Sequence, residues 1–119
     1  MPADINAPAH RIMRDVFPRG PVREWFVHEP AFYYDLLSPH ARTVRLWTTE
    51  YVHVLPGVEA IAEWYRSTGM RPFLDALADD AQRDRFVRDY VAALRQEFHR
   101  RRDGRVLFPF RRLFIVAEN

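Results

Sequence analysis

One stretch of the chain, Thr43 to Val54, constrains the fold more than any other. It is rich in β-branched and aromatic residues, which predicts a β-strand, and alternate side chains of a strand point to opposite faces. One predicted face has mostly the composition of a face that packs on a core, and it carries Val44, Leu46, Thr48, Glu50, Val52 and Val54. The other predicted face carries Arg45, Trp47, Thr49, Tyr51 and His53.

The second face of this strand has two interpretations. Amphipathic aromatic rings beside hydrogen-bonding groups are typical of the wall of a small-molecule pocket. The same composition also fits a solvated sheet face on which a helix covers two rings. The spacing of the residues alone leaves both interpretations open.

The composition excludes several classes of protein. A length of 119 residues predicts one domain or a piece of one, and 48% hydrophobic residues is ordinary for a globular chain. The absence of cysteine excludes disulfides, thiolate metal sites and a cysteine nucleophile. No apolar run approaches the roughly 20 residues of a membrane span, and the first residues contain no signal-peptide core. We therefore expect a cytoplasmic protein that does not bind membranes.

The charge of the chain gives little support for nucleic-acid binding. All 18 basic residues are arginine, but the net charge is only +2. The only dense basic run, 100–102, follows a predicted helix, where cations are favoured by the negative end of the helix dipole. We interpret this run as a helix terminus and expect no nucleic-acid partner.

Apolar periodicity predicts about four helices and two strand regions. Residues repeat at intervals of three and four over Ala9–Phe17, Pro30–Leu37, Val58–Tyr65 and Asp80–Phe98, with a short helical turn after Met70. Gly69 is predicted to end the third helix in the left-handed conformation that glycine often adopts there. The turn at 103–104 leads into apolar runs at 106–110 and 113–116, and Pro109 predicts a bulge or a strand start because proline cannot donate to a ladder.

Two strands are too few for the sheet that this pattern requires. A two-stranded sheet is stable only when helices cover it fully. The continuous apolar run Leu113–Val116 also predicts an interior strand covered on both faces, yet the chain offers it one partner. We therefore expect residues 1–119 to form a single partial domain at the end of a larger α/β domain.

Common catalytic and cofactor motifs are absent from the sequence. The four glycines are isolated, which excludes a phosphate-binding loop or a dinucleotide fingerprint in this chain. The five histidines lack the spacing of metal ligands, and no serine has the context of a nucleophile. Arginines near strand ends and turns could hold a carboxylate through paired charged hydrogen bonds; these are Arg45, Arg71, Arg111 and Arg112.

An ordered set of segments resembles the C-terminal part of the trans-aconitate 2-methyltransferase family, whose members depend on S-adenosylmethionine. The segments that carry the resemblance are Tyr33–Leu37, Trp47–His53, Pro56–Ile61, Trp64, Thr68–Leu74, Gly104–Phe110 and Leu113–Ala117. They cover essentially the whole chain. Because they recur in order over that length, they are more specific than any short motif.

The resemblance implies a portion of a Rossmann-like methyltransferase fold. It identifies the central strand with the sixth strand of that fold and Leu113–Val116 with the seventh, which is antiparallel and lies between the fifth and the sixth. The family holds its cofactor with a glycine-rich turn after the first strand and an acidic residue after the second. Nothing in this sequence corresponds to either, so we expect no S-adenosylmethionine binding by this chain alone.

The resemblance also implies a small polycarboxylate substrate, trans-aconitate, and a set of residues that hold it. The predicted substrate-binding residues are Tyr33, Tyr34, Trp47, Thr49, Tyr51, His53, Arg71 and Arg111. For Trp47, packing alone is an equal alternative, and for His53 a neutral hydrogen-bonding role is favoured over a catalytic base. We assign no catalytic residue and no metal ligand.

Three functions stay open at this point. The chain could be the substrate-side portion of a methyltransferase that is inactive alone. It could instead be a small-acid binding module without catalysis. It could also be a remnant that self-associates as a homodimer through the exposed edge of its last strand.

Overall fold

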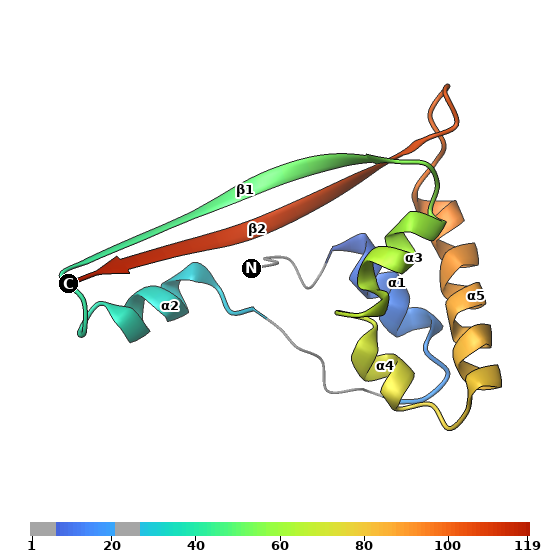
Figure 1. Ribbon diagram of the computed structural model, residues 1–119, viewed down its shortest axis with the longest axis horizontal. Helices are drawn as coiled ribbons and strands as arrows, with labels where there is room; N and C mark the ends of the chain where they lie inside the picture. The colour runs from blue at the N-terminus through green and yellow to red at the C-terminus, as the bar shows by residue number, and fades with distance from the viewer. Residues whose placement is uncertain (1–6, 21–26) are drawn as a thin grey trace. The chain divides into compact units, whose positions relative to one another are not determined.

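The computed structural model describes residues 7–20 and 27–119 and confirms an α/β fold (Figure 1). The described part contains five helices and a two-stranded antiparallel sheet. The elements are α1 (Pro8–Val16), α2 (Pro30–Leu37), β1 (Thr43–Leu55), α3 (Glu59–Arg66), α4 (Arg71–Asp75), α5 (Asp80–Glu97) and β2 (Val106–Glu118). None of the described helices is long and apolar enough to cross a membrane.

The described residues form two compact units. Unit 1 comprises residues 27–52 and 109–119, and unit 2 comprises residues 7–20 and 53–108. Unit 1 therefore contains α2 and most of each strand, whereas unit 2 contains the other four helices described. Each unit has its own set of buried side chains.

The two apolar runs predicted near the C-terminus form one continuous strand. β2 has 13 residues, as β1 does, and it passes through Pro109 without starting or ending there. The prediction of a strand start at Pro109 is therefore wrong. In a two-stranded ladder every second N–H of a strand points away from the partner, and at such a position a proline costs no ladder hydrogen bond.

The side of β1 that packs inward differs from the prediction at one end of the strand. Val52 and Val54 were expected on a core face, but each is 57% exposed, whereas His53 and Leu55 are half-buried. The correction has a simple cause. Val106, Phe108 and Phe110 are buried on alternate positions of β2, and the ring of His53 lies near the ring of Phe108. Inward residues of paired strands share one face, so the His53 face is covered there.

Two ring pairs align β1 with β2 between Trp47 and His53. Trp47 stacks on Phe114 with ring centroids 5.2 Å apart, and His53 lies 6.5 Å from Phe108. Trp47 and His53 are separated by as many residues as Phe108 and Phe114, so both ring pairs fit the same antiparallel alignment. The cross-strand rings thus fix which side chains of β1 share a face with Phe114 and Phe108.

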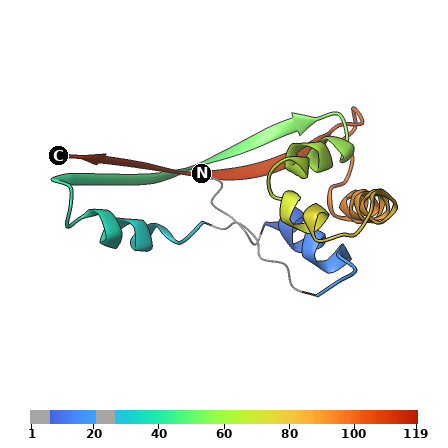
Figure 2. The same cartoon turned by 60° about the horizontal axis from the view of Figure 1, so that its bottom comes forward.

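Unit 2 has an aromatic core built on α5. Both α1 and α3 pack on this helix, and Figure 2 shows it almost end-on, in orange, with the other helices of the unit on one side. The rings of Phe73 and Phe86 stack at 5.9 Å, and the fully buried Tyr90 donates its hydroxyl to the carbonyl of Ala9 at 3.0 Å. Burial raises the pKa of Tyr90, so the phenol stays protonated and keeps this bond.

The ends of α5 follow the sequence prediction. Asp79 caps the helix by accepting a hydrogen bond from the Gln82 backbone at 2.9 Å. After the helix, the turn predicted at 103–104 forms with Gly104 at a φ of 84°, a backbone conformation that glycine adopts without strain. The carboxylate of Asp103 accepts from the Arg105 N–H at 3.0 Å and closes this turn into β2.

Gly69 is needed for a different reason from the one predicted. Its φ is not positive, since Gly104 is the only described glycine in that region, so Gly69 does not form a left-handed cap. A Cβ at position 69 would instead lie 2.9 Å from His10 Cε1 and 3.2 Å from Tyr65 Cδ1. The rings of His10 and Tyr65 meet edge to face at 4.8 Å, which leaves no room for a side chain between them.

We therefore expect Gly69→Ala to destabilise the chain by about 1–3 kcal/mol, the usual cost of overpacking a filled site. Urea unfolding followed by circular dichroism measures this change. Gly20→Ala is the matched control, because no atom lies within 4 Å of a Cβ at that position, and it should change the free energy of unfolding by less than about 0.5 kcal/mol. Equal stability of the two variants would refute the close packing of His10 on Gly69.

Unit 1 has much less buried surface than unit 2. Of its described residues, only Phe110 and Leu113 are buried. No residue of α2 is buried, and three of its large apolar side chains are exposed, namely Phe32, Tyr34 and Leu36. Apolar surface of this kind usually marks a place where another molecule or segment binds.

Candidate functional site

The eight predicted substrate-binding residues fall in both units. Unit 1 contains Tyr33, Tyr34, Trp47, Thr49, Tyr51 and Arg111. Unit 2 contains His53 and Arg71. The roles of all eight residues stay predictions, and the side chains differ in burial and in the partners that hold them.

In unit 1, the predicted wall on β1 remains partly open to solvent. Trp47 is 44% exposed and Tyr51 is 40% exposed, while Thr49 between them is half-buried. Trp47 also stacks on Phe114 with an angle of 12° between the rings. The indole is thus held by its neighbour on β2 and presents the rest of its surface outward, which suits both a packing role and a binding role.

The two tyrosines of α2 are in different environments. The phenol oxygen of Tyr33 accepts a hydrogen bond from the His28 N–H at 3.0 Å, and its ring meets Phe32 edge to face. Tyr33 therefore stabilises the entry into α2. Tyr34 is exposed, and so is Arg111 on β2. An exposed phenol and guanidinium are available to a ligand but are not held in place by burial.

In unit 2, His53 lies within an aromatic cluster. Its imidazole is 4.9 Å from the ring of Trp64, and Trp64 in turn meets Phe108 edge to face at 5.9 Å. These rings hold the imidazole in place, and the predicted hydrogen-bonding role of His53 stays a prediction.

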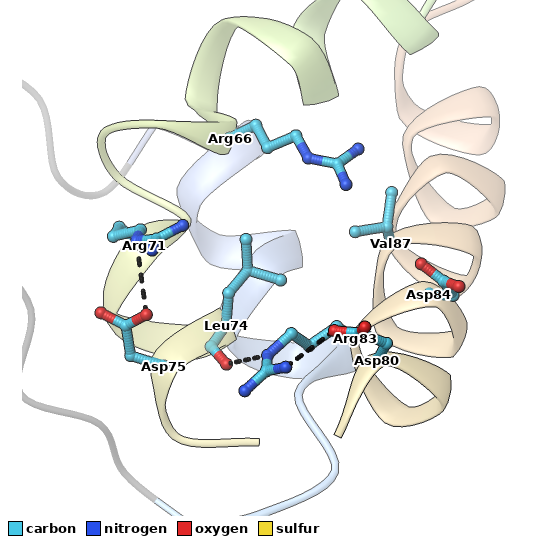
Figure 3. A pocket seen from close by; sticks show the side chains of 8 residues that line it. All are labelled: Arg66, Arg71, Leu74, Asp75, Asp80, Arg83, Asp84 and Val87. Atoms are coloured by element: carbon cyan, nitrogen blue, oxygen red, sulfur yellow. Dashed lines mark hydrogen bonds and ion pairs between the residues drawn. The ribbon is translucent and has the colours of Figure 1, made fainter. Parts of the chain in front are cut away.

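Arg71 lines a hollow in unit 2 between α3, α4 and α5 (Figure 3). The hollow has a volume of about 590 Å³, and we call it the arginine hollow. Its lining residues are Arg66, Arg71, Leu74, Asp75, Asp80, Arg83, Asp84 and Val87. Leu74 and Val87 give it apolar surface, and the remaining six side chains are charged.

Two of the three arginines in the hollow are paired. Arg83 donates to the carbonyl oxygens of Leu74 at 3.0 Å and Leu77 at 2.9 Å, and it also pairs with Asp80 at 2.9 Å. Arg71 pairs with Asp75 at 3.3 Å, with both side chains more than half exposed. The backbone carbonyls fix Arg83 firmly, whereas the exposed pair of Arg71 is weak and open to exchange with another anion.

Arg66 was missed by the sequence reasoning. In Figure 3 its guanidinium extends from the end of α3 into the arginine hollow toward Val87. No ion pair to another described residue holds it, and Asp84 on α5 is likewise outside any described ion pair. The available signal was the placement of two arginines, at 66 and 71, on either side of one short turn between helices.

Glu59 has the one lowered carboxyl pKa that the described residues provide. A hydrogen bond from its own backbone N–H is the main cause, and the side chain of Arg95 is the second. A lowered pKa stabilises the fold above the ordinary value of 4.5, and this contribution is lost as the pH falls through the lower, folded-state value. Both side chains are more than half exposed, so the effect on stability is small.

We expect Arg95→Gln to raise the pKa of Glu59 toward 4.5 without reaching it, because the bond to the backbone N–H remains. Carboxyl chemical shifts recorded across an acid titration measure this directly. Arg88→Gln is the control, since Arg88 is an exposed arginine on the same helix, and it should leave the titration of Glu59 unchanged. If the pKa of Glu59 were the same in both variants as in the unmodified chain, the pairing with Arg95 would be contradicted.

No group of three or more histidine, aspartate or glutamate side chains comes together as a metal site within residues 7–20 and 27–119. β1 ends at Leu55 and leads through residues 56–58 into α3. The predicted binding residues among those described carry guanidinium groups, phenols, a hydroxyl, an imidazole and an indole.

Comparison with known proteins confirms the predicted resemblance. No family model matches the chain. A protein named trans-aconitate 2-methyltransferase from Yersinia pestis (strain Pestoides F) is 40% identical over 126 aligned residues, covering 98% of the chain and 48% of that protein. A protein of the same name from Acidovorax ebreus (strain TPSY) is 39% identical over 127 residues, covering 99% of the chain and 49% of that protein. The chain spans about half the length of these curated relatives and matches their C-terminal part.

Proposed function

We propose that this chain, a homologue of the C-terminal part of trans-aconitate 2-methyltransferases, is the substrate-side portion of a carboxyl methyltransferase. In this proposal the chain recognises a small polycarboxylate, and a further polypeptide portion binds S-adenosylmethionine. The share of the relatives that the chain matches supports this division, because about half of each relative lies outside the match.

The chemistry required of this portion is modest. S-adenosylmethionine would supply an electrophilic methyl group to a carboxylate oxygen of the substrate. A carboxylate is already anionic at neutral pH, so the chain need not provide a base. Its task is to hold the substrate in one orientation and to neutralise the carboxylates that do not react, and fixed orientation is itself a large source of rate.

The arginine hollow is the observation that carries the proposal. Arg66 is not engaged in a described ion pair, and Arg71 has only an exposed pair with Asp75. A carboxylate that binds between them gains charged hydrogen bonds from guanidinium groups, which hold carboxylates in a fixed geometry. Leu74 and Val87 would contact the carbon skeleton of the ligand. The hollow therefore suits a small molecule with several carboxylates and a short apolar body.

We expect Arg66→Gln to weaken the binding of trans-aconitate to this chain by about tenfold, the loss of one charged hydrogen-bonding partner. Isothermal titration at low ionic strength measures the affinity. Arg102→Gln removes the same charge from an exposed position outside the hollow and should leave the affinity almost unchanged. Asp84→Asn should strengthen binding two- to threefold, because it removes a carboxylate that repels the ligand. If the unmodified chain and the three variants bound trans-aconitate equally well, the arginine hollow would not be the binding site.

A methyl-transfer assay tests whether substrate binding and S-adenosylmethionine binding reside in two separate portions. We expect titration of this chain alone with S-adenosylmethionine to give no heat. Mixing it with the N-terminal remainder of the Acidovorax relative should give methylation of trans-aconitate that neither part gives alone, and Arg71→Gln should raise the KM of the mixture. Micromolar binding of S-adenosylmethionine by this chain alone would contradict the proposal.

A small-acid binding module without catalysis is the alternative. The same arginine hollow favours it, since the hollow needs no second polypeptide to bind an anion. The two experiments separate the candidates: binding of trans-aconitate without any activity in the mixture favours the module. In that case, Tyr34 and Tyr51 of unit 1 contribute to binding only if variants of these residues change the affinity for trans-aconitate.

A further inference from the structure

The sheet of the described residues has two edges that no described strand occupies. Its order is β1-β2, so among residues 7–20 and 27–119 each strand has a strand partner along one side only. An open edge presents alternating N–H and C=O groups that can pair with a strand of another chain. Both strands are 13 residues long, well above the length of edge strands that proteins usually leave uncovered.

The open edge of β1 is complementary to itself. An antiparallel copy centred on Thr49 sets Trp47 opposite Tyr51, Leu46 opposite Val52, and Thr48 opposite Glu50. Each of these pairs occurs twice, on either side of the centre. Aromatic pairs and pairs of branched apolar residues stabilise adjacent strands, and no like charges meet between residues 46 and 52. One position further out, Arg45 meets the imidazole of His53.

The exposed side chains of β1 are those that this pairing would cover. Trp47 and Tyr51 lie on one face of the strand, and Val52, the most exposed of the three, lies on the other. Both faces would continue into the second copy, so the aromatic face joins the aromatic face and the apolar face joins the apolar face. Pairing therefore covers apolar surface on both sides of the sheet.

The open edge of β2 lacks this complementarity. Its centre falls at Arg112, so an antiparallel copy would set Arg112 opposite Arg112 and Arg111 opposite Leu113. Like charges directly opposite each other destabilise adjacent strands. Pro109 also removes a backbone donor from this strand. A copy of the chain is accordingly better matched to β1 than to β2.

We infer that two copies of this chain associate through antiparallel pairing of their β1 strands about Thr49. The resulting sheet has the order β2-β1-β1-β2 and reaches the number of strands that an independently stable sheet needs. This interface involves neither the arginine hollow nor methyl transfer. The inference can therefore be confirmed or refuted independently of the proposed function. It assigns the dimer to β1, whereas the sequence alone suggested the edge of the last strand.

A single introduced cysteine tests the interface, because the chain contains no other cysteine. In the inferred dimer the two copies of Thr49 are directly opposite, with Cβ atoms about 5 Å apart, close to disulfide distance. Thr49→Cys, oxidised with copper phenanthroline, should therefore give mostly disulfide-linked dimer on a non-reducing gel. Thr43→Cys is the matched control on the same strand. Its two copies lie about 40 Å apart, since they are offset by twelve residues, and it should cross-link at least tenfold less.

The unmodified chain provides a second measurement that needs no variant. Light scattering should give twice the 14.2 kDa mass of one chain at micromolar concentration. A monomer at this concentration would overturn the inference, and so would equal cross-linking of the two variants. A dimer that cross-links only through Arg112→Cys would place the interface on β2 and would also overturn it.

Discussion

A ladder of two strands must be covered by side chains, because a two-stranded sheet alone is barely stable in water. In unit 2 the strand ends meet this condition, since Phe108 and Val106 are buried and His53 lies beside Trp64. In unit 1 the condition is met less fully. The described residues there include just two buried side chains, Phe110 and Leu113, and several exposed rings. The stability of the sheet in that unit thus depends on additional contacts.

Unit 2 separates packing from binding chemistry. Its interior is occupied by stacked rings and by the hydrogen bond from Tyr90 to Ala9, which contain no charged group. Six of its charged side chains line the arginine hollow, where α3, α4 and α5 meet. Arg83 belongs to both parts, because it satisfies two backbone carbonyls at the entry into α5 and also lines the hollow. Such a rigid arginine can orient its neighbours without binding a ligand itself.

Helix positions and the turn at Gly104 followed from local patterns, because short-range spacing and backbone preference determine them. The covered face of β1 did not follow, since Val52 and Val54 look like core residues until the partners on β2 are known. The role of Gly69 was missed for the same reason: His10 is distant in sequence. In the candidate site, Arg71 was predicted from the sequence. Arg66 was recognised only from the structure, in which a short turn between α3 and α4 brings the two arginines to the same hollow. Contacts between distant residues therefore limit what periodicity alone predicts.

The separation of the two strands in sequence has a kinetic consequence. Fifty residues, 56–105, connect β1 to β2, while the helices between them form mostly from local contacts. Closing a long connection before any ladder contact forms carries an entropic cost that slows folding. We therefore expect the helices of unit 2 to form before the ladder. Until the ladder forms, both edges of β1 are unpaired, so we expect the yield of refolding to fall as the concentration of the chain rises.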